Sequence, residues 1–83
     1  MYYVYCLVSG KKKDFHYYGF TSDIEKRLEY HRKGKVRTTK KYLPIKLYGY
    51  RRFNDREKAL AYEKKVKRSA KEREKFKKEI ISG

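Results

Sequence analysis

Aromatic and β-branched residues form two short runs near the start of the chain. Residues 2–8 read Tyr-Tyr-Val-Tyr-Cys-Leu-Val, and residues 15–20 are again rich in aromatic residues. Such residues favour strands, and the short loop of residues 9–14 predicts that the two strands pair as a hairpin. Strict alternation then places Tyr5 and Tyr17 on neighbouring strands with their side chains on the same face.

Three later segments show the pattern of a capped helix. A serine or asparagine three residues before a glutamate satisfies backbone donors at a helix start, and this spacing occurs in Ser22 with Glu25, Asn54 with Glu57, and Ser69 with Glu72. These pairs predict helices over residues 23–33, 55–68 and 70–81. Gly34 ends the first helix, and residues 35–44 are expected to form a loop before a third strand over residues 45–53.

The predicted order is strand, strand, helix, strand, helix, helix. This order is typical of an α+β fold, in which helices flank a small three-stranded antiparallel sheet. With 83 residues, the chain is expected to form a single domain over residues 1–83. One cysteine, Cys6, allows no intrachain disulfide and fits a reducing cytoplasm. No segment approaches the ~20 apolar residues of a membrane helix, so no membrane partner is expected.

The charge of the chain points to a polyanionic partner. The formal net charge is +15, and residues 26–52 hold eleven Lys or Arg but a single acid, Glu29. Nucleic acid is the first candidate partner for such a surface. The residues expected to contact phosphates come from the predicted loop and the third strand. They are Lys35, Arg37, Thr38, Lys40, Lys41, Arg51 and Arg52.

A carboxylate interrupts the apolar stripe of the second helix. Ala59, Tyr62, Glu63 and Val66 follow the i, i+3, i+4, i+7 spacing of a buried face. An ionised carboxylate in such a position needs a cation, which an arginine, a lysine or a metal ion can supply. The simpler alternative places Glu63 at the edge of the stripe, paired with Lys67.

The first helix also carries polar residues on its apolar face. Arg27 and His31 share this face with Ile24 and Leu28. Arginine suits phosphate binding, and histidine can titrate near neutral pH. The alternatives are a salt bridge for Arg27, with Glu63 as one partner, and an interior histidine with satisfied hydrogen bonds for His31.

In their order and spacing these residues resemble the GIY-YIG nuclease superfamily, in particular its small standalone bacterial members. The resemblance spans residues 3–68. Tyr3-Val4-Tyr5 stands where Gly-Ile-Tyr is usual, and Tyr17-Tyr18-Gly19 stands for Tyr-Ile-Gly. Arg27 and His31 match the helix residues of the family, and Glu63 matches its metal-binding glutamate. Tyr3 and Phe20 depart from the usual pattern, because a glycine and in some members a lysine occupy these places.

The resemblance implies a metal-dependent endonuclease that hydrolyses DNA, with low sequence specificity or a preference for DNA structure and a role in DNA repair. A single Mg²⁺ or Mn²⁺ on Glu63 is expected, with Arg27 on the phosphate and Tyr5 in the same network. The base is Tyr17 or His31, since an ordinary tyrosine is only about one part in a thousand ionised at neutral pH. We expect a monomer that prefers DNA to RNA. The alternatives are a non-catalytic nucleic-acid-binding module and a small ribosome-associated or RNA-binding protein.

Overall fold

The computed structural model describes residues 1–82. The strands are β1 (Tyr2–Ser9), β2 (His16–Thr21) and β3 (Ile45–Phe53), and the helices are α1 (Ile24–Arg32), α2 (Arg37–Lys40), α3 (Arg56–Arg68) and α4 (Ala70–Ser82). The predicted strands and the three longer helices are thus confirmed within one or two residues. No helix in this described part combines the length and apolarity needed to cross a membrane.

The three strands form one antiparallel sheet with β1 in the middle. The strand order is β2-β1-β3, and Tyr5 lies opposite Gly19 on one side and Tyr50 on the other. The pairing of β1 with β3 shifts register between Cys6 and Leu7. The expected three-stranded antiparallel sheet in an α+β fold is confirmed.

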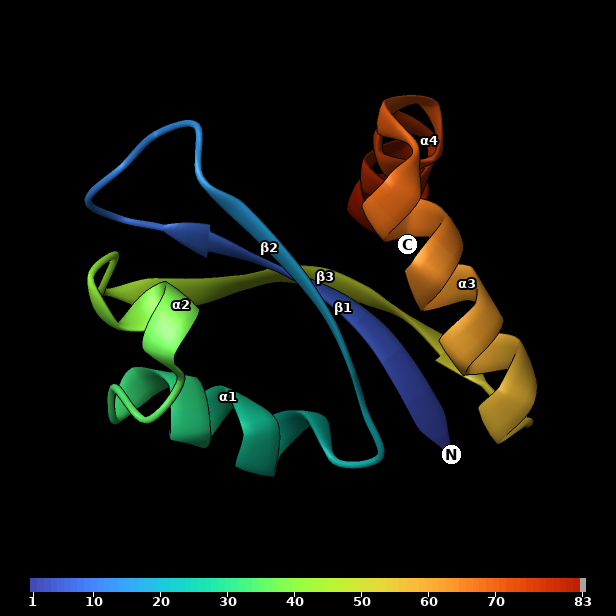
Figure 1. The fold of residues 1–83 in the computed structure, drawn as a ribbon, viewed down its shortest axis with the longest axis horizontal. Helices are drawn as coiled ribbons and strands as arrows, with labels where there is room; N and C mark the ends of the chain where they lie inside the picture. The colour runs from blue at the N-terminus through green and yellow to red at the C-terminus, as the bar shows by residue number, and fades with distance from the viewer. Residues whose placement is uncertain (83) are drawn as a thin grey trace.

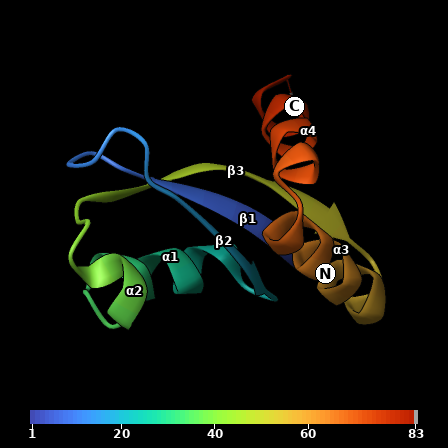
Figure 2. The same ribbon diagram turned by 45° about the horizontal axis from the view of Figure 1, so that its top comes forward.

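Different helices cover the two faces of the sheet. Figure 1 shows α1 and α2 on one side of the strands and α3 and α4 on the other, and Figure 2 shows the same division after rotation. Because successive side chains of a strand point to opposite faces, β1 contributes to both layers. Tyr5 and Leu7 face α1, whereas Val4 and Cys6 face α3 and α4.

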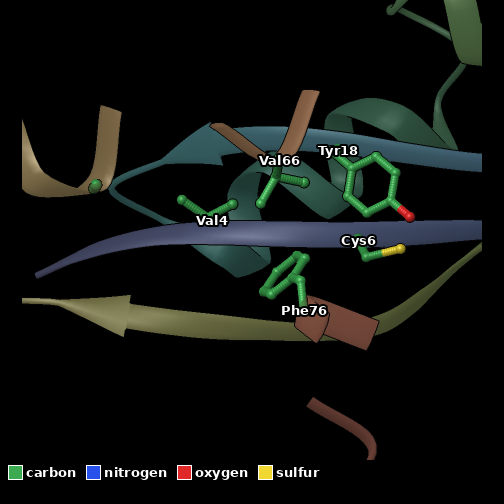
Figure 3. Close-up of a cluster of buried hydrophobic side chains, with 6 residues drawn as sticks. Val4, Cys6, Tyr18, Val66 and Phe76 are labelled. Carbon is green, nitrogen blue, oxygen red and sulfur yellow. The ribbon is translucent and has the colours of Figure 1, made fainter. Parts of the chain in front are cut away.

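The layer under α3 and α4 is apolar. Its fully or nearly buried members are Val4, Cys6, Tyr18, Ala59, Val66 and Phe76, most of which Figure 3 shows packed around β1. The helix α4 approaches β3 closely at Gly49, where a Cβ atom would lie 2.8 Å from the Ile80 Cβ atom. A glycine at this position therefore lets the helix dock.

The layer under α1 and α2 mixes apolar and polar groups. Tyr5, Leu7 and Ile45 form its buried apolar cluster. The two polar residues that the described chain buries completely, His31 and Thr39, also belong to α1 and α2. Buried polar groups require hydrogen-bond partners, so this layer has to provide them.

Two of the predicted helix caps lie one residue too early. The cap of α1 is Asp23 and not Ser22, because the Asp23 carboxylate accepts from the Lys26 amide at 3.0 Å. The cap of α3 is Asp55 and not Asn54, and its carboxylate accepts from the Glu57 amide at 3.0 Å. A carboxylate also interacts favourably with the positive end of the helix dipole.

The third cap is confirmed. The Ser69 hydroxyl accepts from the Glu72 amide at 3.3 Å, as the spacing predicts. Ser69 thus separates α3 from α4.

The end of α1 and the loop after it fix the position of α2. Gly34, with φ of 73°, donates to the His31 carbonyl at 3.0 Å, and Lys35 donates to the Tyr30 carbonyl at 3.3 Å. This pair of bonds is a Schellman motif, which favours glycine at the left-handed position. The expectation of a loop over residues 35–44 is wrong in part, because Arg37–Lys40 forms a helical turn.

Candidate active site

The site begins where the Tyr5 ring crosses from β1 onto Gly19 of β2. The two residues are direct partners in the sheet, and a Cβ atom on Gly19 would lie 2.5 Å from the Tyr5 Cζ atom. Only a glycine leaves room for the ring in this position. The Tyr5 hydroxyl is thereby directed under α1, and Tyr5 is 2% exposed.

Arg27 and His31 of α1 both contact this hydroxyl. The Arg27 Nε–H donates to the Tyr5 oxygen at 3.1 Å, and the His31 Nε2 atom lies 3.2 Å from the same oxygen. Residues four apart lie on one face of a helix, which explains why both reach Tyr5. The predicted inward position of Arg27 and His31 is confirmed.

Thr39 of α2 completes the chain of hydrogen bonds. The His31 Nδ1 atom lies 2.8 Å from the Thr39 hydroxyl oxygen, and this hydroxyl donates to the Val36 carbonyl at 3.5 Å. The Tyr5 oxygen accepts from Arg27, so its own buried proton needs an acceptor, and His31 Nε2 is the nearby one. The tautomer that satisfies all these groups has Nε2 unprotonated and Nδ1–H donating to Thr39. The chain therefore has one direction, from Arg27 through Tyr5 and His31 to Thr39.

The protonation states agree with this direction. Burial and, to a smaller extent, the charge of Arg27 lower the pKa of His31 to about 4, so the imidazole is neutral at neutral pH. Burial raises the pKa of Tyr5, although Arg27 acts in the opposite sense, so the hydroxyl keeps its proton. The hydrogen bond with Tyr5 raises the pKa of Arg27, which stays charged. His31 is thus an interior histidine with both nitrogens engaged.

Tyr17 is the more accessible tyrosine of the site. It is half-buried on β2, and its ring packs edge-on against His31 with centroids 5.2 Å apart. The Tyr17 oxygen also interacts electrostatically with Arg27. The predicted neighbouring pair is confirmed, since Tyr5 and Tyr17 lie on one face and both contact His31.

Glu63 lies on α3, which covers the face of the sheet opposite to α1 (Figure 1). Its side chain is 17% exposed, and the carboxylate pairs with the Lys67 ammonium at 3.3 Å, as the simpler of our two interpretations predicts. No ion pair joins Glu63 to Arg27 within residues 1–82, so that expectation is wrong: Arg27 bonds to Tyr5 instead. The Glu63 charge nevertheless acts on Tyr5, where it raises the pKa slightly.

The residues predicted to contact phosphates divide between two places. The five predicted in the loop, Lys35, Arg37, Thr38, Lys40 and Lys41, are all exposed and flank the buried Thr39. Arg52 is exposed on β3. Arg51 is exposed on the opposite face, where it pairs with Glu79 at 3.3 Å and lies over Tyr62. The structure therefore brings the loop residues to the α1 side but not Arg51.

A family model for the GIY-YIG catalytic domain matches residues 1–78. The chain belongs to the GIY-YIG family. No curated protein and no solved structure shows significant similarity to it. The family consists of nucleases, so membership supports nuclease activity on nucleic acid in general.

The two GIY-YIG motifs acquire a physical meaning in this geometry. The first motif ends at Tyr5 and the second at Gly19. The two residues pair in the sheet, and the Tyr5 ring occupies the space that a side chain on Gly19 would fill. Tyr3, where a glycine is usual, lies outside this contact, and its ring packs edge-on against Tyr50 with centroids 5.4 Å apart. The departure at Tyr3 thus leaves the contact between the motifs intact.

GIY-YIG nucleases generally use divalent metal ions, and the donor set can be tested against such an ion. No group of three or more His, Cys, Asp or Glu residues is close enough to hold a metal among the residues described. Mg²⁺ needs no such group, because it commonly binds through one or two carboxylates, waters and substrate phosphate. Glu63, whose side chain is 17% exposed, can supply the carboxylate for this mode.

Thr39 is the site residue that the sequence analysis missed. It stands among lysines and another threonine in a segment expected to be a loop. Its role depends on α2 turning its hydroxyl toward His31. No spacing rule links residues 31 and 39, so the sequence carried no signal for this contact.

Proposed function

We propose that this protein is a metal-dependent endonuclease that hydrolyses phosphodiester bonds of DNA, with weak sequence specificity or selectivity for DNA structure. The observation that carries the proposal is the position of Arg27. Its guanidinium donates to the Tyr5 oxygen and interacts electrostatically with the Tyr17 oxygen, at a half-buried place beside the exposed basic loop. A fixed cation next to potential proton carriers suits phosphoryl chemistry.

Arg27 binds the scissile phosphate and offsets the charge that develops in the transition state. Guanidinium has five N–H donors, and the Nε–H is the one that holds Tyr5. This bond fixes the plane of the guanidinium, so the remaining donors are directed without a loss of side-chain freedom at the moment of reaction. Tyr5 is therefore a positioning residue in this mechanism.

Tyr17, and not His31, is the general base of the proposal. His31 is 0% exposed, both its nitrogens have partners, and its pKa of about 4 makes it a poor acceptor of a proton. Tyr17 is half-buried and can meet water. Tyr17 takes a proton from the attacking water as the water oxygen bonds to phosphorus, and Arg27 offsets the negative charge that builds up. The P–O bond to the leaving oxygen then breaks, and this oxygen takes up a proton from solvent.

Glu63 would hold a single Mg²⁺ or Mn²⁺. When bound, the ion polarises the phosphoryl oxygen and stabilises the leaving oxygen. Lys67 has to release the carboxylate for this, and the Lys67 side chain is 51% exposed and joined to Glu63 by one ion pair. A cation that replaces Lys67 keeps the carboxylate paired with a positive charge, while the exposed Lys67 ammonium is hydrated by solvent.

The exposed basic loop would hold the DNA backbone. Lys35, Arg37, Thr38, Lys40 and Lys41 all face solvent beside the site. Contacts to phosphates set the position of a strand without reading its bases. The affinity is then expected to fall steeply as salt rises.

The Glu63–Lys67 ion pair also supports a second candidate. A carboxylate that keeps its lysine partner binds no metal, and the protein is then a non-catalytic nucleic-acid-binding module. This alternative retains every basic contact and lacks cleavage.

The test is the cleavage of supercoiled plasmid and of branched and single-stranded DNA, with Mg²⁺, with Mn²⁺ and with a chelator. We expect metal-dependent nicking that Glu63→Gln and Arg27→Lys reduce by about 100-fold or more. Glu57→Gln is the matched control, because Glu57 is on the same helix with a side chain that is 82% exposed. Its cleavage rate should equal that of the wild type.

Equal residual activity in the wild type and in Glu63→Gln would contradict the proposal. The residual activity would then come from a contaminating nuclease. If the wild type also binds DNA, that result establishes the binding module.

A further inference from the structure

Tyr30 is an exposed aromatic side chain beside the proposed phosphate site. It is 45% exposed, and the other large hydrophobic residues that the described chain exposes are Met1 and Tyr50. It lies on α1 one turn after Arg27, so its ring borders the same surface. Tyr30 contributes nothing to either buried cluster of the fold.

Two cations flank the Tyr30 ring. The Arg27 Cζ atom lies 5.6 Å from the ring centroid, and the Lys35 Nζ atom lies 5.7 Å from it. The ring also lines a surface hollow of about 280 Å³, together with Lys26 and the turn before α1. An aromatic ring between cations, at the edge of a hollow, has the composition of a stacking site in proteins that bind single strands.

We propose that Tyr30 is a platform for an unpaired nucleobase, held next to the phosphate that Arg27 binds. The DNA accepted at this site has at least one unstacked base adjoining the cleaved bond. A paired base inside a duplex keeps both its faces covered by its neighbours and has none to offer Tyr30. This inference rests on the proposed function, because it takes Arg27 as the ligand of the phosphate.

The charges around the hollow suit a nucleotide. Lys26, Arg27 and Lys35 are positive, and the one acid in its lining, Asp23, uses its carboxylate to cap α1. A base over the ring places its own phosphate within the reach of these cations. Stacking tolerates every base, so the site selects for an unpaired state and not for a sequence.

The chain contains no tryptophan, so Tyr30→Trp creates a single fluorescent reporter at the site. Tyr50→Trp is the matched control. Tyr50 is similarly exposed, at 47%, but it lies on β3 against Tyr3 and beside a hollow lined by Asp23 and Glu25. Both variants are titrated in a chelator with single-stranded oligothymidylate and with an abasic strand of equal length, while labelled strands report saturation.

We expect oligothymidylate to quench Tyr30→Trp, the abasic strand to quench it far less, and neither strand to quench Tyr50→Trp. With the binding constants read from the labelled strands, Tyr30→Leu should weaken the affinity for oligothymidylate about fivefold or more and leave that for the abasic strand unchanged. Tyr30→Phe keeps the ring and should bind as the wild type does. An unquenched Tyr30→Trp at saturation, or equal affinities in Tyr30→Leu and the wild type, would overturn the platform.

The chelator separates this result from the nuclease assay. Stacking without any metal-dependent cleavage would retain the base site and remove the proposed activity. Cleavage without stacking would retain the activity and remove the base site.

Discussion

The two faces of this small sheet are built from the same strand but with opposite chemistry. On the α3 and α4 face, β1 contributes Val4 and Cys6 to a layer in which apolar side chains fill the space. On the α1 and α2 face it contributes Tyr5, whose hydroxyl joins a chain of polar groups. Replacing both partners of a buried hydrogen bond by apolar groups of the same shape can leave stability unchanged, so stability alone does not account for the polar chain, and the proposed function gives it a role beside Arg27.

The comparison also explains how so short a chain can maintain a polar site. Domains of this size bury a limited apolar surface and are only marginally stable. Here both faces bury apolar side chains, and the face that also buries polar groups supplies each of them with a hydrogen-bond partner. Within the residues described, no buried side-chain nitrogen or oxygen lacks a partner.

Removal of a large side chain from the apolar face should have the largest effect on stability. Phe76 is completely buried there, and we expect Phe76→Ala to lower the free energy of unfolding by about 3–5 kcal/mol. Chemical denaturation measures this change. The rate of cleavage per folded molecule, measured at low temperature, should remain that of the wild type; a specific loss of activity would show that the apolar face takes part in the chemistry.

The buried histidine of the polar face should make the free energy of unfolding depend on pH. The pKa of His31 is lowered from 6.5 to about 4 in the folded protein. Between pH 6.5 and pH 4 the histidine is therefore protonated in the unfolded chain but neutral in the folded protein. Stability should therefore fall as the pH drops through this window, by up to about 3 kcal/mol. Denaturation curves of the wild type and His31→Gln at several pH values measure the difference, and identical pH profiles would contradict it.

Two glycines allow the same substitution on each face. Gly19→Ala pushes a methyl group into the Tyr5 ring, and Gly49→Ala pushes one into Ile80. Overpacking of this kind costs about 1–3 kcal/mol in either case. Only Gly19→Ala should also reduce cleavage by the remaining folded protein, because it displaces the hydroxyl that holds Arg27. Equal cleavage activity in both variants would show that the position of the Tyr5 ring does not affect catalysis.

The smallest effect is expected at Thr39. Thr39→Val removes the acceptor of the His31 Nδ1–H and should cost about 1 kcal/mol of stability. It should also lower kcat with little change in KM. Without the Thr39 hydroxyl the His31 ring is held less firmly, and the Tyr5 hydroxyl that it contacts is then less well positioned. Thr39→Ser restores the hydroxyl and should recover both values; a Thr39→Ser variant as impaired as Thr39→Val would make the effect one of packing.

Much of this division was accessible from the sequence. Alternation placed Tyr5 and Tyr17 on one face, and helical spacing turned Arg27 and His31 inward. Both patterns repeat over a few neighbouring residues, so they can be recognised in a single sequence without knowledge of the contacts between distant segments. The helix caps were displaced by one residue because neighbouring Ser-Asp and Asn-Asp pairs offer two candidates for each helix start.

The parts that were not accessible depend on contacts between distant elements. Thr39 meets His31 only after a helical turn forms in an expected loop. The choice of Lys67 over Arg27 as the partner of Glu63 depends on Arg27 already bonding to Tyr5. The first contact does not follow from periodicity, since it requires α2 to lie against α1. The Glu63–Lys67 pair has the i, i+4 spacing of a helix, so the sequence offered it and left open only the choice between the two partners.

Tyr17 and Tyr18, adjacent in β2 but on opposite faces, offer the most direct test of the central claim. Tyr17 belongs to the polar face and Tyr18 to the apolar cluster under α3 and α4. The metal-dependent cleavage rate of Tyr17→Phe should fall by about 100-fold or more with unchanged DNA affinity, while Tyr18→Phe keeps the wild-type rate. Full activity in Tyr17→Phe, or an equal loss in both variants, would contradict the assignment of the general base to Tyr17.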